Sequence, residues 1–246
     1  MSLSPLTPVT DYQSMLNRIF WFTTAAALAG VWLLRLYIPP LEALLKQIDF
    51  TVAFGDDKIL PIPGGYLLPA LAVGMTTRIY RLHARISDAL ALRECFDVDV
   101  IIAEFATQLG IDLATIPEHE LLAHRHQIMR RAFYPFVTGP QPAIDHGLVL
   151  QALDAWSWFW IGIETTLVFL LTGLALVAGG ARDPGFATIA ATLVLATLGL
   201  PAMRNQCARY AHAQVRAILA EPVRAVTARA ALAELTAGCF VGRAAA

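Results

Sequence analysis

The stretch that decides the fold is residues 158–178, which read WFWIGIETTLVFLLTGLALVA. A helix needs about 20 consecutive apolar residues to cross the roughly 30 Å hydrocarbon core of a bilayer. This stretch has that length, and its single charged side chain is Glu164. It therefore predicts a membrane-spanning helix, and its carboxylate is the first candidate for a functional residue.

Three other segments have a similar length and composition. They are residues 19–38, residues 59–77, which contain three prolines, and residues 186–203. Proline and glycine are more frequent in membrane helices than in soluble ones, so the proline-containing segment is kept as a span. The expected fold class is therefore all-α: a polytopic membrane protein with four transmembrane helices, arranged as two hairpins, and a cytoplasmic helical insert.

The overall composition excludes several classes of protein. The chain has 246 residues, of which 57% are apolar and only 15% are charged, and its mean hydropathy is +0.58. Soluble proteins are about 25% charged, so neither a disordered chain nor an ordinary cytosolic enzyme is expected. The net charge of −1 excludes a bulk electrostatic nucleic-acid binder, and we expect no sequence-specific nucleic-acid partner.

The distribution of lysine and arginine predicts the orientation. The segment between the second and third spans and the tail after the fourth span carry thirteen arginines: Arg78, Arg81, Arg85, Arg93, Arg125, Arg130, Arg131, Arg204, Arg209, Arg216, Arg224, Arg229 and Arg243. The two opposite loops hold only Lys46, Lys58 and Arg182. Basic residues collect on the cytoplasmic side. We therefore expect a multi-pass protein of the cytoplasmic (inner) membrane with both termini in the cytoplasm.

The spans divide the chain into four regions. Residues 1–77 form an N-terminal cytoplasmic segment and the first hairpin, residues 78–145 a cytoplasmic helical region, residues 146–203 the second hairpin, and residues 204–246 a basic helical tail. Thr10 and Asp11 indicate the start of the first helix. In the helical region we expect one helix from Arg78 to about Glu94, a second from Asp97 to Leu109 ended by Gly110, and a third near Pro117.

A basic stripe is expected where each hairpin enters the cytoplasm. On a continuous helix, each of two sets of basic residues falls within a sector of about 60°. The two sets are Arg78, Arg81 and Arg85, and Arg209, His212 and Arg216. The stripe suits anchoring against anionic lipid headgroups. The alternative is a ring of arginines that meets a phosphate-bearing ligand or lines a pore vestibule.

Glu164 is the expected intramembrane polar site. A carboxylate at this depth costs about 1–3 kcal/mol, so it should face a partner or water. Its candidate roles are ion selectivity, proton relay, or a pair between subunits with an arginine such as Arg204. The alternative is that its side chain only reaches toward the membrane interface.

Catalytic and metal sites are not expected. The residues from Arg78 to His83 have the Arg-x4-His spacing of HEPN-type ribonucleases, but on one straight helix these two side chains would be about 140° apart. The histidines of the third cytoplasmic helix point to different sides and have no zinc-type companion; they are His119, His124 and His126. We therefore expect no catalytic residue, no metal and no cofactor.

The architecture resembles small multi-span effectors of bacterial conflict systems, in which a cytoplasmic module senses a signal and the oligomer perturbs the membrane. This resemblance carries over no individual residues. It implies a non-enzymatic, homo-oligomeric, channel-like or membrane-perturbing effector in bacterial defence or stress. Its partners would be the lipid bilayer, further copies of the chain, and a cytoplasmic protein or an anionic small molecule as the signal. The alternatives are a small transporter and, third, a membrane-tethered HEPN-like nuclease.

Overall fold

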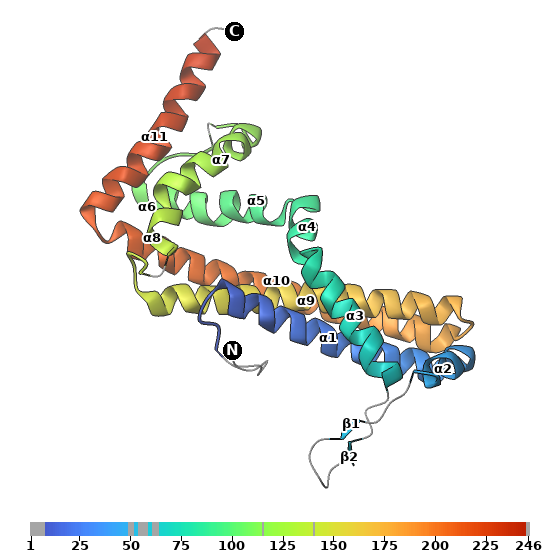
Figure 1. The fold of residues 1–246 in the computed structure, drawn as a ribbon. Helices are drawn as coiled ribbons and strands as arrows, with labels where there is room; N and C mark the ends of the chain where they lie inside the picture. The colour runs from blue at the N-terminus through green and yellow to red at the C-terminus, as the bar shows by residue number, and fades with distance from the viewer. Residues whose placement is uncertain are drawn as a thin grey trace. The chain divides into compact units, whose positions relative to one another are not determined.

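The computed structural model describes residues 8–48, 52–53, 59–60, 64–114, 116–139 and 141–244. The described residues are almost entirely helical, which confirms the expected fold class at this level (Figure 1). The elements are α1 (Tyr12–Tyr37), α2 (Pro39–Lys46), β1 (Val52–Ala53), β2 (Ile59–Leu60), α3 (Gly64–Ile79), α4 (Leu82–Ala89), α5 (Leu92–Phe96), the π-helix η1 (Asp97–Ile102), α6 (Ala103–Leu109), α7 (Glu118–Ala132), α8 (Tyr134–Val137), α9 (His146–Ala178), α10 (Arg182–Leu219) and α11 (Pro222–Ala244).

Three helices in the described part of the chain are long and apolar enough to cross a membrane: α1, α9 and α10. They contain the predicted first, third and fourth spans. Helices α9 and α10 are longer than predicted, because α9 begins at His146 and α10 continues through Pro201 to Leu219. Helix α1 begins after Asp11, as predicted, and the Asp11 carboxylate accepts a hydrogen bond from the backbone N–H of Ser14 at 2.6 Å.

The predicted second span is helical over only part of its length. Ile59 and Leu60 pair with β1 in a short antiparallel ladder, and α3 begins at Gly64. Residues 61–63 lie outside the described residues, as does Lys58 of the orientation argument. Proline in a helix interior removes a hydrogen-bond donor, which explains why the helix begins after two of the three prolines. The helix then accommodates Pro69 in its interior.

The described chain forms two compact units. Unit 1 comprises residues 1–85 and 156–204, and in it α1 packs along α3. The backbones of α9 and α10 also approach closely, because a Cβ atom added to Gly185 would lie 2.9 Å from the carbonyl oxygen of Gly173. Unit 2 comprises residues 86–155 and 205–246. Its core is apolar, with Ile102, Phe105 and Met129 almost completely buried.

The helix expected from Arg78 to Glu94 is broken twice, so that prediction was wrong. Helix α3 ends at Ile79, α4 covers Leu82–Ala89, and α5 begins at Leu92. At the two breaks, Arg81 and Ala91 each have a φ of 49°. Residues other than glycine seldom adopt this left-handed conformation. No glycine or proline in the sequence marks either break.

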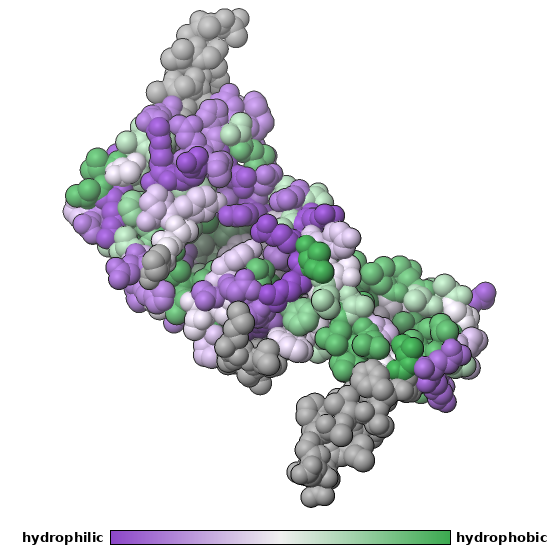
Figure 2. Space-filling model, viewed as in Figure 1, coloured by the Kyte–Doolittle hydropathy of each residue, from purple (hydrophilic) through white to green (hydrophobic). Residues whose placement is uncertain are grey.

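The hydropathy of the surface differs between the units (Figure 2). On the face shown, hydrophobic residues gather over the elements of unit 1, whereas polar residues predominate over unit 2. Along α10, the most exposed apolar side chains are those of Leu195 and Leu198, both 71% exposed. This exposed apolar surface is typical of a helix that faces lipid.

Candidate functional site

Glu164 lies at the centre of a buried polar cluster in unit 1. Its side chain, on α9, is only 1% exposed, and Thr23 on α1 is completely buried beside it. The Thr23 hydroxyl donates a hydrogen bond to Oε2 of Glu164 at 2.6 Å. The other carboxylate oxygen, Oε1, lies 3.8 Å from Nδ1 of His83. Both of these side-chain contacts of Glu164 lie within one chain.

The break at Arg81 places His83 at this cluster. Because α4 begins at Leu82, the backbone N–H of His83 lies in the first turn, where it has no partner within the helix. This N–H donates a hydrogen bond to the Glu164 carboxylate instead. A helix N-terminus also carries a partial positive charge, which favours a nearby carboxylate.

The imidazole of His83 is buried and only partly satisfied. The residue is 7% exposed, and its ring centroid lies 6.0 Å from that of Trp160. In the described part of the chain, no group forms a hydrogen bond with its Nε2 atom. Burial and, second, the positive charge of Arg81 hold the pKa of His83 below its usual 6.5. The imidazole is therefore mainly neutral at pH 7.

A small cavity adjoins Glu164 and His83. Its volume is about 30 Å³, which is room for one or two water molecules. The lining residues are Leu16, Ile19, Phe20, Thr77, Arg78, Arg81, His83 and Glu164. Two of these residues, Arg78 and Arg81, are exposed, whereas His83 and Glu164 are buried. The cavity thus joins exposed arginines to a buried acid and a buried imidazole.

The structure divides the predicted basic stripe among different contacts. Arg78 donates a hydrogen bond from Nη1 to Oδ1 of Asn17 at 2.7 Å, and the guanidinium of Arg85 lies 5.3 Å from the ring centroid of Tyr80. The 60° sector assumed one continuous helix, and the left-handed Arg81 interrupts it. These three arginines therefore do not form a single helical face.

The second predicted set lies on α10 in unit 2. Nε of Arg216 is 3.4 Å from Oε1 of Glu104, and Nδ1 of His212 is 4.0 Å from Oε2 of the same carboxylate. Arg209 is exposed. Arg216 is thus paired with an acid on α6 that also lies near His212, and the helical-wheel argument could not include this acid.

Two arginines on α1 are buried. Arg18 is 7% exposed and donates a hydrogen bond to the Ser157 hydroxyl at 3.1 Å. Arg35 is 5% exposed, and its guanidinium lies 3.9 Å from the ring centroid of Tyr66. Both side chains link α1 to another helix of unit 1, which explains how their charge is tolerated in an apolar segment.

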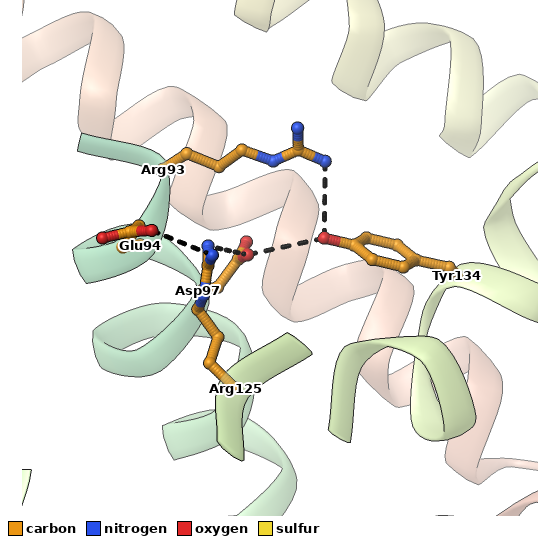
Figure 3. A network of polar contacts seen from close by, with 5 residues as sticks. All are labelled: Arg93, Glu94, Asp97, Arg125 and Tyr134. Carbon is orange, nitrogen blue, oxygen red and sulfur yellow. Dashed lines mark hydrogen bonds and ion pairs between the residues drawn. The ribbon is translucent and has the colours of Figure 1, made fainter. Parts of the chain in front are cut away.

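Unit 2 contains a second polar network that the sequence analysis did not identify (Figure 3). Arg125 on α7 donates hydrogen bonds from Nη1 to Asp97 and from Nη2 to Glu94, both at 3.1 Å. The Tyr134 hydroxyl donates to Asp97 at 3.5 Å and accepts from Arg93 at 3.3 Å. The network joins α5, η1, α7 and α8.

Asp97 is the buried centre of this second network. It is 4% exposed and begins the π-helix η1. Burial raises its pKa from the ordinary 3.8 to about 6, although Arg93 and Arg125 pull the pKa down. Burial, followed by the charge of Asp97, also raises the pKa of Tyr134. Single π-helical turns are frequent at functional positions, so this network is a candidate for control of unit 2.

The described residues contain no group of three histidine, cysteine, aspartate or glutamate side chains that could hold a metal ion. The histidines of α7 are all exposed; they are His119, His124 and His126. Nδ1 of His124 lies 3.1 Å from the backbone carbonyl of Glu120 in the same helix.

Comparison with known proteins identifies the family of this chain. The model of the YmfE protein family matches residues 11–230, which is most of its length. The chain belongs to the YmfE protein family. Neither a curated protein nor a solved structure gave a significant match. The Glu164 cluster and the Asp97 network both lie within the matched range of this YmfE family member, so both are parts of the family region.

Proposed function

We propose that this chain is a homo-oligomeric, channel-like protein that passes cations across the bacterial inner membrane at Glu164. It crosses the membrane four times, with both termini in the cytoplasm, and its cytoplasmic helices control it during defence or stress. The partners in this proposal are the lipid bilayer, further copies of the chain, and a cytoplasmic protein or an anionic small molecule that acts as the signal.

The buried carboxylate of Glu164 carries this proposal. Ionisable residues inside membrane spans are costly and mark the paths of ions and protons. Glu164 is 1% exposed, yet it lines a cavity that also includes the exposed Arg78 and Arg81. A carboxylate with only a structural role would need its partners Thr23 and His83 but no space for water beside it.

The fourth span in the proposal is α3. This helix is apolar and lies along α1, with a close approach at Gly74, where an added Cβ atom would meet the Thr24 hydroxyl and the Phe20 ring. The basic residues before α9 and those after α10 lie on the same side of the membrane in either case, because two spans, α9 and α10, separate them. If α3 also crosses, Lys46 lies on the opposite side and the N-terminus on the same side as these basic residues, which is the orientation proposed here.

Control from the cytoplasm is proposed for unit 2. This unit has its own apolar core and ion pairs between helices, such as that of Arg131 with Glu234. The exposed members of the basic set predicted to bind headgroups or a ligand are Arg78, Arg81, Arg85, Arg209 and Arg216. They are the positions proposed for an anionic headgroup or a phosphate-bearing signal.

The second candidate function is a small transporter. One observation favours it: two side chains that contact Glu164, those of Thr23 and His83, come from the same chain as Glu164. The nuclease alternative gains no such support. Arg78 and His83 line the same cavity, but about 30 Å³ is too small to admit a nucleotide.

Ion flux in lipid vesicles tests the proposal. Wild-type protein is expected to dissipate an imposed cation gradient, reported by a potential-sensitive dye, and Glu164→Gln is expected to lose most of this flux. The matched control is Glu42→Gln, because Glu42 is on α2 and pairs with Lys46 of the same helix. Equal flux from wild type and Glu164→Gln contradicts the role of Glu164, and absence of flux from wild type contradicts the channel.

Stoichiometry in detergent separates the two candidate functions. A ring of four or more copies favours the channel-like protein, whereas a dimer favours the small transporter. A monomer contradicts the proposed homo-oligomer.

A further inference from the structure

We propose that the ion carried at the Glu164 site is the proton, and that His83 delivers it to Glu164 from the cavity lined by Arg78 and Arg81. This inference rests on the proposed function, because it names the ion that moves through the same site. It assigns His83 the role of a proton relay between the cavity and the carboxylate.

The unsatisfied ring nitrogen of His83 is the first observation. Nε2 is buried and has no hydrogen-bond partner in the described part of the chain, while the residue lines a cavity large enough for water. A buried polar atom without a partner is costly, and a water molecule can satisfy it where the cavity has room and polar groups beside it. The polar groups at this cavity include the Glu164 carboxylate, the His83 ring and two guanidinium groups, and in the proposal a water molecule held among them is the proton donor for Nε2.

The second observation is the position of the other ring nitrogen. Nδ1 of His83 faces Oε1 of Glu164 at 3.8 Å, and a small rotation of either side chain would bring this distance to that of a hydrogen bond. Because Nδ1 faces an acceptor, we assign the ring proton of the neutral imidazole to Nδ1. The bare Nε2 is then free to accept a proton.

The proton transfer follows from this arrangement. A hydronium ion in the cavity gives a proton to Nε2 and becomes water, so the ring becomes imidazolium. The imidazolium releases the proton on Nδ1 to Oε1 of Glu164, which becomes a neutral carboxylic acid. The ring is neutral again, with its proton now on Nε2, and the first tautomer returns by exchange through water, in which Nε2 gives its proton to a water molecule and Nδ1 takes one from water. The depressed pKa of His83 keeps the waiting ring neutral.

A metal cation fits this site poorly. Ca²⁺ and Mg²⁺ take about six or more oxygen ligands, whereas among the described residues that line the cavity only Glu164 carries a carboxylate. The other charged side chains around the cavity are Arg78 from α3 and Arg81 from the junction with α4, and α1 contributes the uncharged Thr23 hydroxyl to the carboxylate. A proton needs no shell of ligands, since it binds one atom at a time.

The backbone supports a dedicated position for His83. Arg81 holds a left-handed conformation with a φ of 49° two residues before the imidazole. Such strain persists where the surrounding structure requires it and is frequent at functional positions. If α3 continued as a straight helix, His83 would lie about 140° away from Arg78 around the axis; the break allows both side chains to line one cavity.

The test measures proton flux in vesicles loaded with a pH-sensitive dye, with the membrane potential clamped by valinomycin and potassium. His83→Ala is expected to lower the initial proton flux about a hundredfold or more, the lower end of what a positioned proton-transfer group contributes. Added imidazole is expected to restore part of the flux by occupying the space left by the side chain. His124→Ala is the matched control, because His124 is exposed on α7, and its flux should equal that of wild type.

Each other outcome overturns a defined claim. Flux of sodium or potassium ions without proton flux overturns the inference and leaves the proposed cation path standing, whereas no flux of any ion overturns both. Loss of flux that imidazole does not restore, together with a lower melting temperature, shows that His83 is only structural. If the His83→Ala variant does not fold, His83→Gln, which retains hydrogen-bonding groups, takes its place. Unchanged proton flux in the His83→Gln variant overturns the inference.

Discussion

Replacing Thr23 by valine removes the shortest side-chain contact of the Glu164 carboxylate while keeping the shape of the residue. Thr23 is completely buried, and its hydroxyl donates to Oε2 of Glu164 at 2.6 Å. A hydrogen bond to a charged group contributes about 1.5–3 kcal/mol. For a chain of this length, each kcal/mol shifts the melting temperature by about 2–4 °C. Thr23→Val should therefore lower the melting temperature by about 3–12 °C.

The assay is thermal unfolding in detergent, followed by tryptophan fluorescence. The control is Thr192→Val, since Thr192 is also buried but donates only to the carbonyl of Thr188 in its own helix. A double-mutant cycle with Glu164→Gln isolates the coupling, because a neutral partner reduces the contribution of the hydroxyl to about 1 kcal/mol. Equal shifts for Thr23→Val and Thr192→Val would refute the reasoning.

Three further predictions address packing, pH and topology. In Gly185→Ala, the new Cβ atom would lie 2.9 Å from backbone atoms of α9, so we expect a loss of about 1–3 kcal/mol in stability. The control is Gly199→Ala, because a Cβ atom added to Gly199 would have no atom within 4 Å, and this variant should be neutral or slightly stabilising. Equal melting temperatures for Gly185→Ala and Gly199→Ala would contradict the packing of α9 on α10. Because the folded state raises the pKa of Asp97 from 3.8 to about 6, it binds the proton more tightly than the unfolded state. Unit 2 should therefore lose up to about 3 kcal/mol as the pH rises from 4 to 7. Hydrogen exchange of the backbone amides in η1 and α6 should report this loss of stability, and the Asp97→Asn variant should lose less stability over the same pH range. An equal loss in the variant would disprove the assignment of the pH dependence to Asp97. Alkaline phosphatase fused after Lys46 or Gly180 should be active, and fused after Gly110 or Ala246 inactive, whereas equal activity after Lys46 and after Gly110 would remove α3 as a span.

The parts of the fold that follow from local sequence could be predicted. Asp11 begins α1, and Gly110 adopts a left-handed φ of 69° after α6, as its place beyond an apolar helix indicated. The breaks at Arg81 and Ala91 could not be predicted, because arginine and alanine favour helix and neither position contains a turn signal. Tertiary packing decides both conformations against the local preference.

The candidate site was predictable only in its parts. Glu164 was identifiable because an isolated carboxylate in an apolar segment is energetically costly. Its partner Thr23 gives no signal in the sequence, since threonine is common in spans and the contact joins helices 141 positions apart. On a straight helix the side chains of His83 and Arg78 would be about 140° apart, and nothing in the sequence indicates that the helix is broken between them. The Asp97 network was missed because its members come from four elements whose packing the sequence does not specify.

The most direct test of the account is the protonation of Glu164 itself, measured by infrared difference spectroscopy on protein in lipid vesicles. The Asp97→Asn variant serves as the background, so that the other buried acid does not contribute to the carboxyl region. A carboxylic acid C=O band is expected to appear and disappear reversibly as the pH is changed, and to be absent when Glu164→Gln is added. A spectrum without such a band, or a band that does not respond to pH, would contradict the claim that Glu164 takes up and releases a proton.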